Sequence, residues 1–154
     1  MVFDCDEQIG GYKVINFCLL SETSDWPVVL NDVTSNQIVL TREVNSICGM
    51  LVPNSIRVRE KPSTTKSGQL WDISISYEFA VQNSALEQLL DQYANRPGVC
   101  EVEKNYPQKK LYGSDKFPLL MTYELINGEK PEDGSKTVIT IKGKVPHRAV
   151  HIAT

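Results

Sequence analysis

The sequence has few cysteines, four in 154 residues, and no two of them form a Cys-x-x-Cys pair. Common zinc-binding and redox motifs need cysteines that lie close together in sequence, so the wide spacing excludes those motifs. We therefore expect small, buried, apolar thiols rather than a metal site or a structural disulfide. The four are Cys5, Cys18, Cys48 and Cys100.

Histidine is also scarce. His147 and His151 are four residues apart, a spacing that would place both on one face of a helix as a metal-binding pair. They follow Pro146, however, and no third ligand is evident nearby. We therefore expect a solvated tail after Pro146, and neither a metal nor any other cofactor.

Recognisable catalytic motifs are missing too. There is no Gly-x-Ser-x-Gly sequence and no glycine-rich loop of the kind that holds phosphates. Neighbouring carboxylates such as Glu101 and Glu103 could in principle act as acid and base, although such pairs are more often solvated. The sequence therefore favours a protein that is not an enzyme. An enzyme of unrecognised type would need a carboxylate pair with perturbed pKa values in a pocket.

No apolar run is long enough to cross a bilayer, and the first seven residues are acidic where a signal peptide would be basic. The formal net charge of −3 is too small to predict a class of partner. We expect a protein that is made in a cytoplasm and stays there, folded as a single domain over residues 1–154.

The most informative segment that is present runs from residue 70 to residue 95. Large apolar residues occupy every second position from Trp71 to Phe79, which predicts a strand with one buried face. Leu86, Leu90 and Tyr93 then follow at helical spacing, so we predict one α-helix over about residues 84–95. Leu89 lies on the same predicted face.

The rest of the chain predicts further strands in runs, which together give about seven. The segments are 11–20, 37–44, 55–61, 99–103, 119–126 and 137–145, with an apolar run at 47–52 and a short edge strand at 28–30. We predict loops at residues 62–68, 105–118 and 127–136. We also predict that the last two strands form an antiparallel hairpin. We therefore predict an α+β fold that is mainly antiparallel β, a sandwich or open barrel with the helix packed on a sheet.

Basic residues alternate with apolar ones at 55–61, so that Arg57, Arg59 and Lys61 point outward, with Lys66 just beyond. Such a stripe could contact phosphates, guard a strand edge against aggregation, or form half of a charged subunit contact. Loop aromatics offer a second kind of surface. Trp26, Tyr106 and Tyr112 would suit a monomeric sandwich or barrel module that binds a small ligand or carbohydrate.

Two segments, 67–75 leading into the predicted helix and 110–119 leading into the last hairpin, resemble small tail or neck proteins of tailed bacteriophages. The order of strands, one helix, a long loop and a final hairpin is similar to the tail-tube and tail-terminator architecture. The resemblance covers roughly the C-terminal half of the chain.

The resemblance implies a virion subunit of the tail, neck or head-tail connector. It would assemble with copies of itself and with other virion proteins into a ring or tube, in the host cytoplasm and then in the virion. DNA would pass transiently through a mildly acidic bore that does not grip it. Candidate bore-facing acids are Glu101, Glu103, Glu129, Glu132 and Asp133, and candidate interface residues are Arg57, Arg59, Lys61, Lys66, Tyr106, Tyr112 and Phe117.

Overall fold

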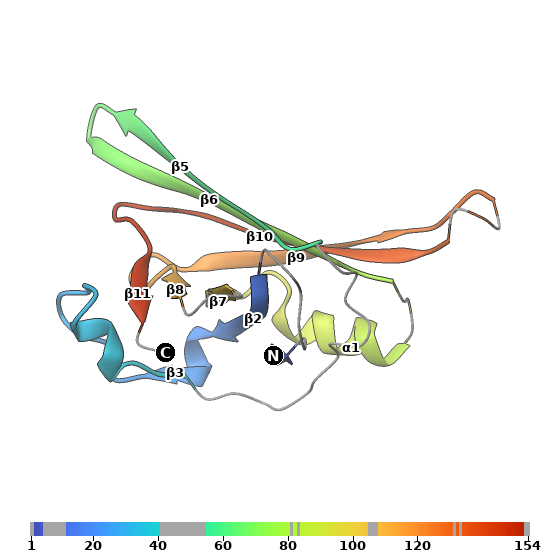
Figure 1. Cartoon of the computed structure of the whole chain (residues 1–154), viewed down its shortest axis with the longest axis horizontal. Helices are drawn as coiled ribbons and strands as arrows, with labels where there is room; N and C mark the ends of the chain where they lie inside the picture. The colour runs from blue at the N-terminus through green and yellow to red at the C-terminus, as the bar shows by residue number, and fades with distance from the viewer. Residues whose placement is uncertain are drawn as a thin grey trace.

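The computed structural model describes residues 2–4, 12–40, 55–80, 82, 84–104, 108–130, 132 and 134–152. Within them, seven strands follow one another through a single curled sheet in the order β1-β2-β7-β9-β10-β6-β5, and β8 and β11 extend it from β7 (Figure 1). The paired strands run antiparallel. The predicted α+β fold with an open barrel is confirmed.

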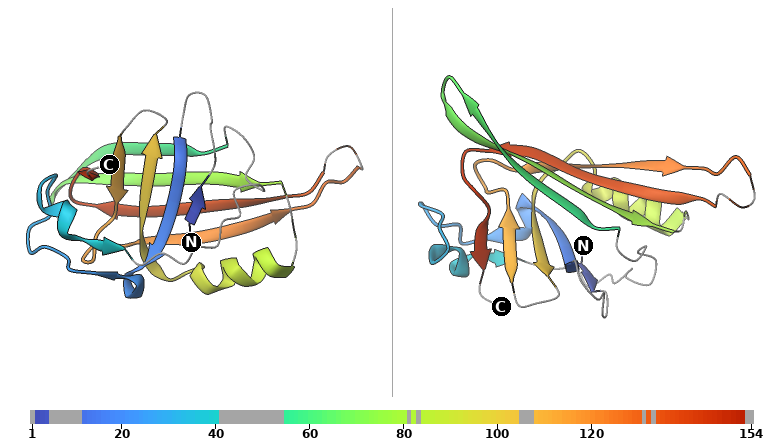
Figure 2. Two further views of the ribbon diagram at one scale, coloured as in Figure 1. Left: turned by 60° about the horizontal axis from the view of Figure 1, so that its bottom comes forward. Right: turned by 45° about the horizontal axis from the view of Figure 1, so that its top comes forward.

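The sheet divides into two arms at β7. The long arm contains β5 (Arg57–Thr65), β6 (Gly68–Phe79), β10 (Lys136–Val145) and β9 (Leu119–Ile126). The cross arm contains β1 (Val2–Asp4), β2 (Tyr12–Leu19), β7 (Pro97–Lys104), β8 (Lys109–Tyr112) and β11 (Val150–Ile152). Its strands run across those of the long arm, and the two arms join where Gly98 pairs with Leu119 (Figure 2).

The helix α1 (Ser84–Tyr93) begins and ends close to its predicted bounds. It buries Leu86, Leu90 and Tyr93 in the main core, between the two arms, with Leu89 partly buried beside them. The next turn ends the helix, because Asn95 adopts a left-handed φ of 60° and its N–H donates to the carbonyl of Met121 at 2.8 Å. The predicted helix face is therefore the buried one.

A second, smaller core lies on the other face of the cross arm. It contains Cys18, Val99, Leu111 and Val150, and is covered by the segment from Leu20 to Leu40. That segment forms η1 (Leu20–Glu22), β3 (Thr23–Ser24), η2 (Thr34–Gln37) and β4 (Val39–Leu40). The cross-arm strands β2, β7, β8 and β11 thus contribute residues to the second core as well as bordering the main one, whereas the long arm has one face in the main core and one in solvent.

The structure confirms the interpretation of the two cysteines that it describes. Cys18 and Cys100 are buried and are not joined in a disulfide. Cys5 and Cys48 lie outside the described residues. Burial raises the pKa of the Cys100 thiol, and the nearby Cys18 and Glu101 raise it further. The Cys100 sulfur therefore stays protonated, which makes it a poor nucleophile.

Several predicted loops contain strands. Residues 62–68 form the end of a long β5–β6 hairpin that turns at Lys66 and Ser67, and the strand passes through Pro62. Proline is tolerated there because β5 is at the edge of the sheet, where the strand is hydrogen-bonded on one side only. Residues 105–118 contain β8. The prediction of a solvated tail after Pro146 is wrong for residues 150–152. They form β11, which pairs with β8 and buries Val150.

Two other predictions near the N-terminal half need correction. Residues 28–30 do not form an edge strand, because Val28 and Val29 form an exposed bend and Leu30 packs against the second core. Gln37 belongs to η2, so the strand predicted over 37–44 starts at Val39. Residues 41–44 of that prediction and the apolar run at 47–52 lie outside the described residues.

Candidate functional site

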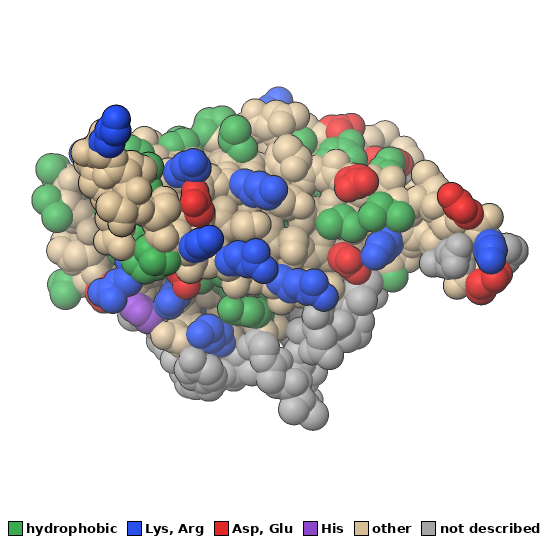
Figure 3. Space-filling model, turned by 90° about the horizontal axis from the view of Figure 1, so that it is seen from above, with side chains coloured by type: hydrophobic (Ala, Val, Ile, Leu, Met, Phe, Trp, Pro, Cys, Tyr) green, Lys and Arg blue, Asp and Glu red, His purple; other side chains and the backbone are tan. Residues whose placement is uncertain are grey.

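The predicted basic stripe lies on the solvent-facing side of the long arm. Arg57, Arg59 and Lys61 are all exposed on β5, as their alternation predicts, and Lys66 is exposed at the β5–β6 turn. Figure 3 views this face and shows basic side chains gathered over its middle, with acidic side chains nearer the β9–β10 end. The stripe is therefore part of a wider basic surface.

Strand register adds two lysines that the alternation on β5 does not indicate. Arg59 pairs with Ser74, which pairs with Lys142 on β10. One step along, Lys61 pairs with Asp72, which pairs with Lys144. Directly paired residues of an antiparallel sheet share one face, so these five cations lie together. We call Arg57, Arg59, Lys61, Lys142 and Lys144 the basic face.

The aromatic residues proposed as a ligand surface do not come together. Trp26 packs against the second core and its Nε1 donates to Thr23 Oγ1 at 2.8 Å. Tyr112 is not in a loop but in β8, where it is buried in the main core. Its side chain is therefore not available as an interface residue. Phe117 is exposed, and Tyr106 lies outside the described residues.

A surface that sequence reasoning missed is an exposed apolar loop. Val28, Val29 and Val33 are 89%, 66% and 79% exposed, within six residues of one another. Single exposed apolar residues are common on soluble proteins, but a group of them close together is a candidate interaction surface. We call residues 26–34 the valine loop. Its sequence, Trp-Pro-Val-Val-Leu-Asn-Asp-Val-Thr, has no alternation that would distinguish exposed from buried valines.

Hydrogen bonds within the valine loop favour the turn that it forms. Asn31 Oδ1 accepts from the N–H groups of Val33 and Thr34 at 2.9 and 2.8 Å. Thr34 Oγ1 donates to the carbonyl of Val29 at 2.7 Å. At its base, Trp26 and Leu30 pack against the second core. A loop restrained in this way loses less conformational entropy on binding a partner than an unrestrained one does.

The valine loop and the β9–β10 hairpin lie at opposite ends of the molecule along its longest axis (Figures 1 and 2). Leu125, near the outer end of β9, is 37% exposed. A contact between one end of a subunit and the other end of the next uses two different surfaces. Repeated contacts of this kind close into a ring when the rotation between subunits allows it.

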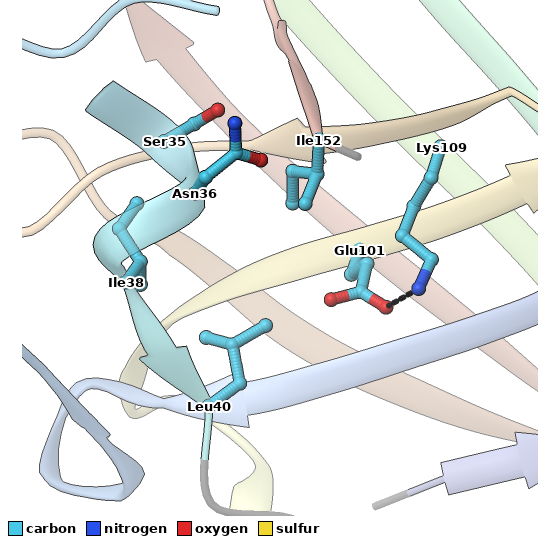
Figure 4. Close-up of a pocket in the computed structure, with 7 residues that line it drawn as sticks. All are labelled: Ser35, Asn36, Ile38, Leu40, Glu101, Lys109 and Ile152. Atoms are coloured by element: carbon cyan, nitrogen blue, oxygen red, sulfur yellow. Dashed lines mark ion pairs between the residues drawn. The ribbon is translucent and has the colours of Figure 1, made fainter. Parts of the chain in front are cut away.

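A pocket of about 400 Å³ opens between the segment from Leu20 to Leu40, which covers the second core, and the cross arm. Ile38, Leu40 and Ile152 form its apolar side, and Glu101 and Lys109 face each other across from them (Figure 4). The Lys109 ammonium lies 3.3 Å from the Glu101 carboxylate, whose side chain is only 4% exposed. Glu101 was a candidate bore-facing acid, but its burial inside the chain removes it from that role.

The buried pair makes a stability prediction. Lys109→Met removes the ammonium that faces the enclosed Glu101 carboxylate, so we expect the free energy of unfolding to fall by about 3 kcal/mol. Replacing both residues, as Glu101→Leu with Lys109→Met, should cost less than Lys109→Met alone, because no charge is then enclosed. Urea unfolding measures both. The single variant Glu101→Leu completes the comparison. If the double variant loses as much free energy of unfolding as Lys109→Met and Glu101→Leu lose together, the two residues are not coupled.

The histidine pair does not form a metal site with other described residues. His151 lies in β11 and its N–H donates to Asp32 Oδ1, while the ring of His147 contacts the carbonyl of Arg148. Across the ranges that the structure describes, no group of three or more His, Cys, Asp or Glu side chains could hold a metal ion.

The chain matches no protein-family model, no curated protein and no solved structure. The part of the chain described above contains no helix that is long and apolar enough to span a membrane.

Proposed function

We propose that this protein is a structural subunit of a tailed-bacteriophage virion, in the tail, neck or head-tail connector. Copies of it would assemble, together with other virion proteins, into a ring or tube through which DNA passes. Assembly would take place in the host cytoplasm. The role is mechanical and requires no catalytic residue.

The observation that carries the assembly part of this proposal is the valine loop. Its exposed side chains would desolvate on contact with a partner, at roughly 25 cal/mol for each Å² of apolar surface removed from water. The hydrogen bonds within the loop lower the entropic cost of that contact. The partner that we propose is the opposite end of a second copy, around the β9–β10 hairpin. The resemblance of segments 67–75 and 110–119 to tail and neck proteins supports the virion part.

Two aspartates in the valine loop should abolish assembly. Val28→Asp with Val33→Asp would bury charge in the proposed contact, so we expect a folded monomer at concentrations at which the native protein is oligomeric. Sedimentation velocity measures the change, and circular dichroism reports whether the fold is kept. Leu120→Asp is the matched control and should assemble normally, because Leu120 is exposed and lies at the end of β9 that is farther from the β9–β10 turn, away from the valine loop. An aspartate pair that leaves the oligomer unchanged would exclude the valine loop from the contact.

The alternative proposal, a monomeric module that binds a small ligand or carbohydrate, now depends on the pocket in Figure 4. The described residues that line it are aliphatic, amide, hydroxyl and charged, with no aromatic among them. A carbohydrate site would usually present an aromatic ring, so the pocket supports a small amphipathic ligand better than a sugar. A monomer that binds such a ligand would favour this alternative.

A further inference from the structure

The basic face concentrates charge in a chain whose overall charge is negative. Its five cations and the single carboxylate of Asp72 carry a formal charge of +4, which leaves −7 for the rest of the chain, given the total of −3. Lys144 lies 3.8 Å from Asp72. Within the described ranges, no carboxylate forms an ion pair with Arg57, Arg59, Lys61 or Lys142. Four cations on this face are therefore available to an external anion.

The sheet holds these cations in rows. Successive outward residues of a strand are about 7 Å apart, and β5 and β10 are separated by β6, which puts their rows about 10 Å apart. The hydroxyl side chains of Ser74 and Ser76 lie between the rows. Beside them a shallow groove of about 490 Å³ runs between Leu120, Thr122 and Lys142. The surface is therefore extended, positively charged and rich in hydrogen-bond donors.

Edge protection alone accounts for part of this surface. Charges on β5 and Pro62 guard a strand edge, as edge strands usually require. Lys142 is different, because β10 is paired there with Ser74 of β6 on one side and Leu120 of β9 on the other, and has no free edge to guard. Lys144 lies beyond the last β10 residue that pairs with β9, and it faces Asp72. Edge protection therefore does not explain the alignment of Lys142 with the β5 cations.

We propose that the basic face binds duplex DNA through its phosphates, without reading sequence. Duplex DNA presents one negative charge for about every 1.7 Å of its axis, a density that several cations on one surface can match. Single-stranded DNA is recognised by stacking on aromatic rings, and the outward residues of the described long-arm strands include none. This inference rests on the proposed function, in which DNA passes through the assembled protein. It differs from the expectation of a mildly acidic bore, because the basic face would bind the DNA.

The test is binding of a short fluorescein-labelled duplex of mixed sequence to the full chain, followed by anisotropy between about 50 and 200 mM salt. With four phosphates neutralised, log K should fall with log salt at a slope of about −3.6. Arg57→Gln with Arg59→Gln removes two contacts, so the slope should become shallower by about 1.8. Arg96→Gln with Arg148→Gln, two exposed arginines outside the four strands, is the matched control and should keep the native slope.

If the Arg57 and Arg59 variant fails to fold, Lys61→Gln with Lys142→Gln carries the same prediction. No binding at low salt, equal slopes for the variant and its control, or tighter binding of a single strand than of the duplex would each overturn the proposal. Native mass spectrometry of the same samples distinguishes DNA binding from self-assembly. Rings that do not bind DNA would refute only the proposal that the basic face binds DNA. A monomer that binds DNA would refute only the proposal that the protein forms a ring.

Discussion

Gly98→Ala should destabilise the fold by about 3 kcal/mol, at the upper end of the usual cost of overpacking. A Cβ at this position would lie 2.5 Å from the backbone oxygen of Cys18 and 2.6 Å from Cζ of Phe17. Neither atom can move away easily, because Cys18 is paired with β7 and Phe17 is fully buried. Gly98 also stands at the junction of the arms, where it pairs with Leu19 on one side and Leu119 on the other.

Urea unfolding or thermal unfolding would measure the loss, which for a chain of this size corresponds to a fall in Tm of roughly 10 °C. Gly134→Ala is the control. Gly134 has a left-handed φ of 65°, but a Cβ added there would meet no atom within 4 Å, so its cost should be limited to about 1 kcal/mol of backbone strain. Equal losses at the two positions would show that the close approach at the junction is not what makes Gly98 necessary.

Leu90→Ala should cost about 3 kcal/mol as well, for the opposite reason. Leu90 is fully buried on the face of α1 that closes the main core, and truncating it leaves a cavity as well as lost apolar contact. Chemical denaturation should show a lower midpoint with an unchanged slope. Gln92→Ala, at an exposed position of the same helix, should change stability by less than about 0.5 kcal/mol.

A small effect of Leu90→Ala would mean that α1 packs loosely on the sheet. In that case the helix could detach without unfolding the two arms, and the main core would have to be described without it.

Local patterns in the sequence predict the elements in which neighbouring residues decide the structure. The alternation from Trp71 to Phe79 and the helical spacing from Leu86 to Tyr93 each specify one buried face. The final hairpin follows from two apolar runs on either side of the turn-rich segment 127–136. These elements appear in the structure with bounds close to those predicted.

Features that depend on distant segments could not be predicted in this way. The division of the sheet at β7 needs that strand to pair with β2, β8 and β9, and no local pattern records such pairings. The basic face shows the same difficulty. Alternation on β5 predicts that Arg57 and Arg59 point outward, but the alignment of Lys142 with them depends on register across β6.

The valine loop cannot be predicted from composition. It is a candidate contact because its valines are exposed, and composition does not show whether a valine is exposed or buried. Valines in a short run predict a strand, and the prediction of an edge strand at residues 28–30 follows from that preference. In the structure the Asn31 and Thr34 hydrogen bonds fold this segment into a turn that faces solvent. A polar side chain that bonds to its own backbone can override β-propensity in this way.

Native mass spectrometry and negative-stain imaging of the purified protein, over a series of concentrations, test the central proposal most directly. We expect closed oligomers or short tubes with a central bore, which become more abundant as the concentration rises. A protein that remains monomeric at every concentration would contradict self-assembly through the valine loop.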